Sequence, residues 1–270
     1  MDTLLQDLRY AIRSLRKSPG FTATAVVTLA LGIGANTAIF SLVDSLLLRT
    51  LPVNDPARLV LITDSAPAHV RVWSYPVWEQ IRQRPELFER TGAWSFTRFN
   101  LASGGETQFV DGLWASGSLF DTLGVRALVG RTFSPADDRR GGGDEGPVAL
   151  IGYRFWSQHF AGARDVVGRS LRIEGVPVTI VGVAPPRFFG PEIGRAFDIV
   201  LPIGCEPLVR GRDSFLDHSG ITFLTIVARL RPDQTTDAAA AGLRRVQPQI
   251  RDATLGEIGR FDSRARSIAT

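Results

Sequence analysis

Two successive hydrophobic patterns occupy the first 48 residues. Residues 2–17 repeat apolar side chains at spacings of three and four, which predicts a short amphipathic helix. Residues 19–43 contain no charged side chain and are mostly aliphatic. A run of this length can cross a hydrocarbon core of ~30 Å at ~1.5 Å per residue. We therefore expect an interfacial helix over residues 1–19 and a transmembrane helix over residues 20–48.

The apolar run continues through Leu46, Leu47 and Leu48. A signal peptide has a shorter apolar core that is soon followed by a cleavage site with small residues. A helix buried in a soluble protein would show a polar face, which this run lacks. Both alternatives are less favoured than an uncleaved membrane anchor.

A basic cluster lies just before this run and consists of Arg9, Arg13, Arg16 and Lys17. The positive-inside rule places such a cluster in the cytoplasm, so the residues after about 48 should be periplasmic. Arginines on an interfacial helix also meet lipid phosphates. The net charge of +4 and the pI near 9.9 are therefore attributed to the membrane and not to nucleic acid.

Small residues recur every fourth position within the apolar run, at Ala30, Gly34 and Ala38. They share one stripe of the helix, and small side chains let a second transmembrane helix approach closely. We expect this stripe to be a helix-packing face. The alternative is that it faces lipid.

The remaining residues mix strand and helix patterns. Glu174 and Gly175 separate two β-branched runs, which is typical of a hairpin turn. The predicted strands are 58–62, 107–115, 148–151, 170–173, 176–183 and 222–230, and the predicted helices are 74–90, 155–160 and 235–250. This pattern indicates an α+β fold, a mixed α/β domain that comes after one transmembrane helix. Residues 137–146, rich in glycine and charge, are interpreted as a solvent loop.

The chain contains few residues for catalysis or metal binding. Its only cysteine is Cys205, its three histidines lie far apart, and its only lysine is Lys17. A disulfide, a cysteine zinc site and a Walker A motif are therefore excluded. No Gly-x-Ser-x-Gly sequence is present, although scattered carboxylates leave a glycosidase-like pair open. We expect no catalytic residue, no cofactor and no metal.

Two further patterns have a functional and a structural interpretation. The acidic residues of the 137–146 loop lack the spacing of an EF-hand, so a solvent loop is favoured over a calcium site. The five tryptophans could form a carbohydrate platform, but packing within the domain explains them more simply.

Several segments resemble one family. Residues 13–22 (RSLRKSPGFT) and 29–40 (LALGIGANTAIF) resemble the start of MacB/FtsX-type ABC transporter permeases, in particular the duplicated orphan permease branch described from acidobacteria. Similar segments recur through the rest of the chain, at 120–125, 130–133, 155–160, 167–169, 175–177 and 181–185. The sequence departs from the family at Thr50, where proline is usual, and at Gly117-Ser118, which replace a more polar pair.

The resemblance implies a MacB-like periplasmic core domain over residues 49–270. Its porter-like part, built of β-α-β units, would comprise about 55–116 and 221–252, and an inserted Sabre-like lobe about 117–220. Complete members continue into three more transmembrane helices, so we expect this chain to be the N-terminal part of an inner-membrane permease.

The resemblance also implies a function. The chain itself would be no enzyme, since a separate cytoplasmic ABC ATPase hydrolyses ATP and drives movement of the outer domain, which is called mechanotransmission and serves efflux or export. The implied partners are this ATPase, a second permease copy in a dimer, membrane lipids and a periplasmic adaptor. The alternative is a stand-alone, membrane-anchored binding or sensor domain without transport activity.

Overall fold

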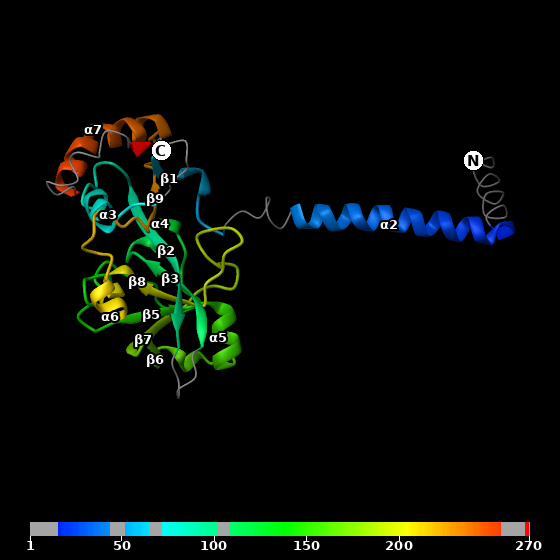
Figure 1. The fold of residues 1–270 in the computed structure, drawn as a ribbon, viewed down its shortest axis with the longest axis horizontal. Helices are drawn as coiled ribbons and strands as arrows, with labels where there is room; N and C mark the ends of the chain where they lie inside the picture. The colour runs from blue at the N-terminus through cyan, green and yellow to red at the C-terminus, as the bar shows by residue number, and fades with distance from the viewer. Residues whose placement is uncertain (1–15, 44–51, 65–71, 102–107, 255–267, 270) are drawn as a thin grey trace. The chain divides into compact units, whose positions relative to one another are not determined.

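The computed structural model describes residues 16–43, 52–64, 72–101, 108–254 and 268–269. The chain divides into two compact units, residues 1–50 and 51–270 (Figure 1). The predicted interfacial helix lies outside the described residues except for its end, and so do Arg9 and Arg13.

The described residues of the first unit, 16–43, contain one long helix, α2 (Pro19–Val43). Its residues Pro19–Ser41 are long and apolar enough to cross a membrane, and none of them packs inside the protein. The threonines satisfy their hydroxyl groups within the helix: Thr24, Thr28 and Thr37 each donate to the carbonyl four residues earlier, at 2.8–3.0 Å. The helix agrees with the predicted span as far as residue 43, and residues 44–48 lie outside the described part.

Where the structure describes it, the second unit is built on a ten-stranded sheet. The strands lie in the order β10-β1-β9-β2-β3-β8-β5-β7-β4, and β6 pairs with β7. Their bounds are β1 (Leu59–Asp64), β2 (Arg90–Asn100), β3 (Phe109–Ala115), β4 (Val129–Gly130), β5 (Val148–Ile151), β6 (Ser170–Ile173), β7 (Val176–Val183), β8 (Ile199–Pro202), β9 (Thr225–Arg229) and β10 (Ile268–Ala269). The α+β expectation is confirmed.

The sheet is mixed, because β3 runs parallel to β8 and β5 parallel to β7, while the other pairs are antiparallel. β8 and the other strands from the segment 117–220, β4 to β7, lie on one side of β3, and β1, β2, β9 and β10 lie on the other. The two groups of strands therefore meet at one parallel pair, which joins Gly112–Ala115 to Ile199–Pro202.

Both faces of the sheet are buried. On one face, Ile199 and Leu201 of β8 join a core that also holds Trp78 and Trp114. On the other face, Val200 lies in a second core with Leu113. The central strands β5 and β8 are buried at every position, as expected of strands covered on both faces.

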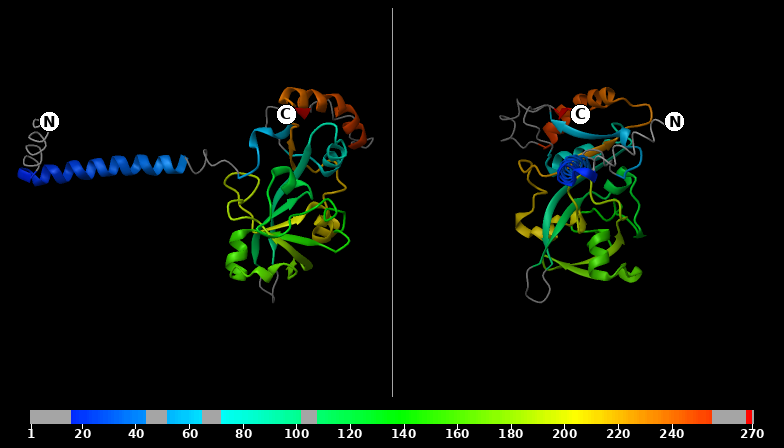
Figure 2. Two further views of the ribbon diagram at one scale, coloured as in Figure 1. Left: turned by 180° about the vertical axis from the view of Figure 1, so that it is seen from behind. Right: turned by 90° about the vertical axis from the view of Figure 1, so that its right-hand side faces the viewer.

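Helices cover the two faces unequally. The first core contains residues of α3 (Tyr75–Arg82), α5 (Tyr153–Phe160) and α7 (Thr236–Thr254), with α6 (Glu206–Arg210) at its margin. The second contains α4 (Leu119–Leu123) and the loop residues Phe133, Phe188 and Phe197. Figures 1 and 2 show α3 and α7 at the end of the domain that holds β1 and β9, and α5 at the opposite end.

Several predicted elements are confirmed. The strands 148–151, 170–173 and 176–183 coincide with β5, β6 and β7. Glu174 and Gly175 both have positive φ, 48° and 83°, which is the backbone of a tight two-residue hairpin turn. The strands 58–62, 107–115 and 222–230 correspond to β1, β3 and β9 within a few residues, although residue 107 lies outside the described part.

The helix predicted over 74–90 is wrong in its second half. It ends at Arg82, because Pro85 disfavours helical backbone in the residue before it, and residues 90–100 form strand β2 instead. The predicted helix 155–160 starts two residues earlier, and 235–250 extends to Thr254 despite Pro248. The short elements α4, β8 and α6 were not predicted, since four or five residues carry no clear periodicity.

Candidate functional site

The predicted membrane residues lie on the first unit. Arg16 and Lys17 are exposed, and so are Ala30, Gly34 and Ala38 along α2. A Cβ added at Gly34 would meet no atom within 4 Å, so nothing in this unit fills the stripe. The helix-packing role of the stripe stays a prediction.

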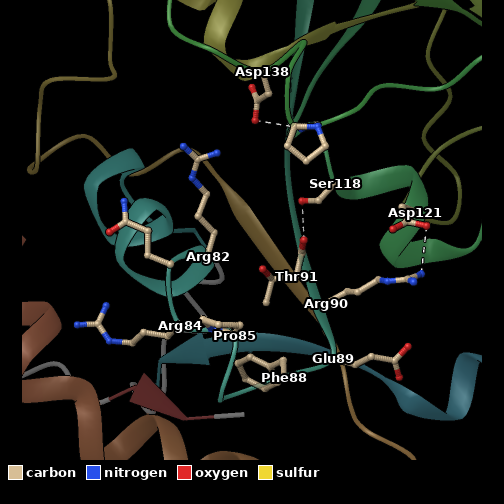
Figure 3. A pocket seen from close by; sticks show the side chains of 13 residues that line it. Arg82, Arg84, Pro85, Phe88, Glu89, Arg90, Thr91, Ser118, Asp121 and Asp138 are labelled. Atoms are coloured by element: carbon tan, nitrogen blue, oxygen red, sulfur yellow. Dashed lines mark hydrogen bonds and ion pairs between the residues drawn. The ribbon is translucent and has the colours of Figure 1, made fainter.

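The second unit contains a groove of about 410 Å³ near the end of β3 (Figure 3). One wall is the connection from α3 to β2, with Arg82, Phe88 and Arg90. The opposite wall comes from the start of α4, with Ser118, and from Asp138. The groove thus lies where the β2–β3 part of the sheet meets the segment that comes after β4.

Asp138 is the most deeply buried charged residue of the groove, with only 3% of its surface exposed. Its carboxylate accepts a hydrogen bond from the Gly117 amide at 3.0 Å and another from the Gly204 amide at 2.7 Å. These glycines lie just past β3 and β8, the two neighbouring parallel strands. Asp138 therefore links the carboxyl ends of the pair at which the two groups of strands meet.

Burial raises the pKa of Asp138 to about 6, although the two amide bonds and the nearby Arg82 favour the carboxylate. At neutral pH the group is thus a carboxylate under a desolvation cost. The same burial raises the pKa of the Cys205 thiol, in η4 (Ile203–Cys205), to about 12, so this thiol stays protonated and unreactive.

Gly117 and Gly204 are fixed by close backbone contacts. A Cβ on Gly117 would lie 2.3 Å from the Ser134 carbonyl oxygen, and one on Gly204 would lie 2.3 Å from that of Arg139. The segment 134–139 therefore packs directly onto both strand ends.

The solvent loop predicted over 137–146 is wrong at its start. Asp137 and Asp138 are buried, whereas Asp144 and Glu145 are exposed. Burial by itself would raise the pKa of Asp137, but two bonds from Arg131 and two from Ser134 lower it below the usual value. The two aspartates point to different partners and hold the loop in place.

The other charged side chains that line the groove each bond to a partner. Arg82 pairs with Glu79 at 2.7 Å, and Arg90 pairs with Asp121 at 3.1 Å. The Ser118 hydroxyl donates to the Thr91 carbonyl at 2.6 Å, so it is engaged as well. Figure 3 shows Arg82 directed toward the side of Asp138 and Arg90 toward Asp121. This arrangement holds segments together and offers no nucleophile next to a base.

The tryptophans pack inside the domain. Trp78, Trp94, Trp114 and Trp156 are at most 8% exposed, and Trp114 meets Phe99 edge-to-face at 5.0 Å between ring centroids. The packing interpretation is confirmed and the carbohydrate platform is excluded for these four. Sequence reasoning missed the groove itself, because its walls come from segments about 50 residues apart.

A sequence profile identifies the domain. The profile of the MacB-like periplasmic core domain matches residues 22–246. The chain belongs to this family. Comparison with curated proteins gives no significant match.

Solved structures show the same MacB-like fold. A permease domain from Porphyromonas gingivalis is similar with a TM-score of 0.52 and 21% identity, over 72% of this chain and 85% of that one. The extracellular domain of the noncanonic ABC-type transporter YknZ from Gram-positive bacteria has a TM-score of 0.52 and 11% identity, over 78% and 100%. The periplasmic region of MacB from Actinobacillus actinomycetemcomitans has a TM-score of 0.52 and 11% identity, over 74% and 89%.

The MacB-like domain and the apolar helix α2 together fit a protein of the inner membrane. The chain is a transporter-permease domain and not a classical enzyme, and permeases of ABC transporters work with an ATPase subunit. The groove therefore belongs to a domain whose family role is in transport.

Proposed function

We propose that this chain is the part of a MacB/FtsX-type permease that couples ATP hydrolysis by a separate cytoplasmic ATPase to movement of its periplasmic domain. The observation that carries the proposal is the family match from residue 22 to residue 246, which includes the apolar helix and the outer domain together.

The proposal includes a division of the outer domain. The porter-like part would comprise about 55–116 and 221–252, and the inserted lobe about 117–220. The two groups of strands on either side of the β3–β8 pair support this division, and the shared cores on both sheet faces make the two parts move together unless that pair opens. A second permease copy, lipids and a periplasmic adaptor are the further partners that we propose.

Coupling is tested by co-purification and ATPase assay. The complete permease that contains this chain should stimulate its ABC ATPase in proteoliposomes, whereas the ATPase without it should turn over at its basal rate. The chain alone should hydrolyse no ATP and should gain no thermal stability from it, because a bound ligand stabilises a protein in proportion to occupancy. An increase in melting temperature with ATP would show that this chain holds a nucleotide site, as would be expected of a sensor domain that binds ligand by itself.

Orientation gives a separate prediction. A periplasmic reporter such as alkaline phosphatase, fused after Thr270, should be active, because Arg9, Arg13, Arg16 and Lys17 hold the N-terminus in the cytoplasm. A cytoplasmic reporter at the same position should be inactive. Reversal of the two signals would place the domain in the cytoplasm and contradict the proposed function.

The stripe of small residues on α2 gives a prediction about helix packing. In the complete permease, Gly34→Leu should impair assembly without preventing insertion, since leucine blocks close helix contact but is as apolar as lipid requires. Ala25→Leu is the matched control, since Ala25 lies on the opposite side of the helix from Ala30, Gly34 and Ala38. Crosslinking from single cysteines at positions 34 and 25 checks the interface, and crosslinks at 25 alone would show that the stripe faces lipid.

A further inference from the structure

The outer unit begins with a tight turn, Asn54–Arg58, which starts eleven residues after the end of α2. Asp55 in this turn has a φ of 46°, a left-handed conformation that a residue with a Cβ keeps only when its surroundings hold it. The Arg58 guanidinium bonds to the Asp55 carboxylate at 2.7 Å and to the Leu230 carbonyl at 3.1 Å. The turn is thus closed on itself and tied to the end of β9.

A second arginine, which is buried, also holds this turn in place. Arg229 is 4% exposed, and its guanidinium bonds to three backbone carbonyls: Nη2 to Asn54 at 2.7 Å, Nη1 to Asp55 at 3.4 Å and Nε to Thr122 at 2.8 Å. Within the described part of the chain, no carboxylate forms an ion pair with it. Burial of a charged guanidinium costs desolvation free energy, and the three bonds to carbonyl oxygens offset that cost.

The end of α4 closes the other side of the turn. The Asn54 amide donates to the Leu123 carbonyl at 3.1 Å. Gly124, at φ 71°, packs so closely that an added Cβ would lie 2.6 Å from the Asn54 Cβ. Arg229 therefore connects three elements: the turn, the end of α4 and strand β9. We call this set of contacts the joint.

Along the chain, this joint lies between the membrane segment and the edge of the sheet. From the turn the chain enters β1, which lies next to the sheet edge and pairs with β9 through Leu59–Ile62 only. A load applied to residue 52 reaches the joint before it reaches β1. Without the joint, the load would open four backbone pairs one after another; with it, several bonds to β9 and α4 carry the load together.

We propose that Arg229 is the positioning residue through which displacement of the membrane segment passes to strand β9 and helix α4 without passing through strand β1. The biological use of this joint rests on the proposed function. The contacts of the joint lie within this chain alone. Experiments can therefore reject the role of Arg229 while coupling to an ATPase is found, or support that role while coupling is not found.

The joint is tested first by hydrogen exchange of the full chain in detergent. In Arg229→Met, the Asn54 amide should exchange at least about tenfold faster than in the native protein, because the carbonyl bonds that hold the turn are lost. Arg229→Lys should lie between the two, since one ammonium cannot reach both Asn54 and Thr122 as a planar guanidinium does. Unchanged protection in Arg229→Met would overturn the proposal.

The path of the load is tested by single-molecule pulling on the same full chain. Handles are attached at Pro52→Cys and Asp144→Cys, both exposed positions, while Cys205 is buried and unreactive. Leu243→Ala, a core change on α7, serves as a control that lowers thermal stability without touching the joint. We expect Arg229→Met to lower the rupture force more than Leu243→Ala does at equal loss of melting temperature.

If Arg229→Met prevents folding, Arg58→Gln takes its place, since Arg58 is only half-buried and its loss removes its own bonds to Asp55, Glu89 and Leu230 while those of Arg229 remain. The rupture force should then fall without a matching change in melting temperature. Equal rupture forces for joint and control variants at equal stability would show that the load does not pass through Arg229.

Discussion

Gly204→Ala is expected to lower the free energy of unfolding by about 3 kcal/mol or more, at the upper end of the range for overpacking. The added Cβ would lie 2.3 Å from the Arg139 carbonyl oxygen and 2.7 Å from the Asp138 carbonyl carbon. Both are backbone atoms, so the methyl group fits only if the 134–139 segment moves. That movement also breaks the 2.7 Å bond from the Gly204 amide to Asp138.

Gly220→Ala is the matched control, because nothing lies within 4 Å of a Cβ there and its φ is ordinary. Urea unfolding followed by tryptophan fluorescence measures both variants, since all five tryptophans lie in the outer unit. Gly204→Ala with the stability of Gly220→Ala would show that the loop does not pack on the end of β8 as described.

The second large effect is a pH dependence set by Asp138. Its pKa is about 6 in the folded protein and about 3.9 in an unfolded chain. Between these values the folded state binds a proton that the unfolded state has released. The free energy of unfolding therefore falls as pH rises through this window, by about 3 kcal/mol at ~1.4 kcal/mol per pKa unit, and the loss is complete above about pH 6.

Asp138→Asn should flatten this profile, because an amide carries no charge at any pH in the range. The profile is measured by urea unfolding from pH 4.5 to 7.5. Asp121→Asn, an exposed change in the same groove, is the control and should keep the native slope. Asp137 contributes in the opposite sense and below this window, since its lowered pKa adds stability that is lost only in stronger acid. A native slope in Asp138→Asn would mean that Asp138 does not titrate near pH 6.

The raised pKa of Asp138 has a structural consequence for the groove. At neutral pH the carboxylate that joins the ends of β3 and β8 carries a desolvation cost, which two amide bonds only partly offset. Any movement that admits water to the groove relieves part of that cost. The β3–β8 pair is therefore the place in the sheet where charge favours opening, while the continuous cores on both faces oppose it.

The sequence by itself determined the features that depend on neighbours along the chain. A long apolar run gives α2 because hydrogen bonds within a helix satisfy its backbone without help from elsewhere. The β-branched runs around Glu174-Gly175 give the hairpin β6–β7 because two residues of positive φ fix the turn and the register. The family segments spread from residue 13 to residue 185, which is why the MacB-like domain could be predicted.

Only the tertiary structure decided the features that depend on distant segments. Residues 90–100 become a strand because β3 and β9 flank them, and the buried run 199–202 becomes a strand because it lies between β3 and β5. Asp138 looks like a loop residue in sequence, yet it is buried since its partners Gly117 and Gly204 lie 21 and 66 residues away. Arg229 looks like an ordinary end of a strand, and its three carbonyl partners lie more than 100 residues earlier. Periodicity reports which face of an element is apolar, but it does not report which backbone groups a charged side chain will meet once the sheet has assembled.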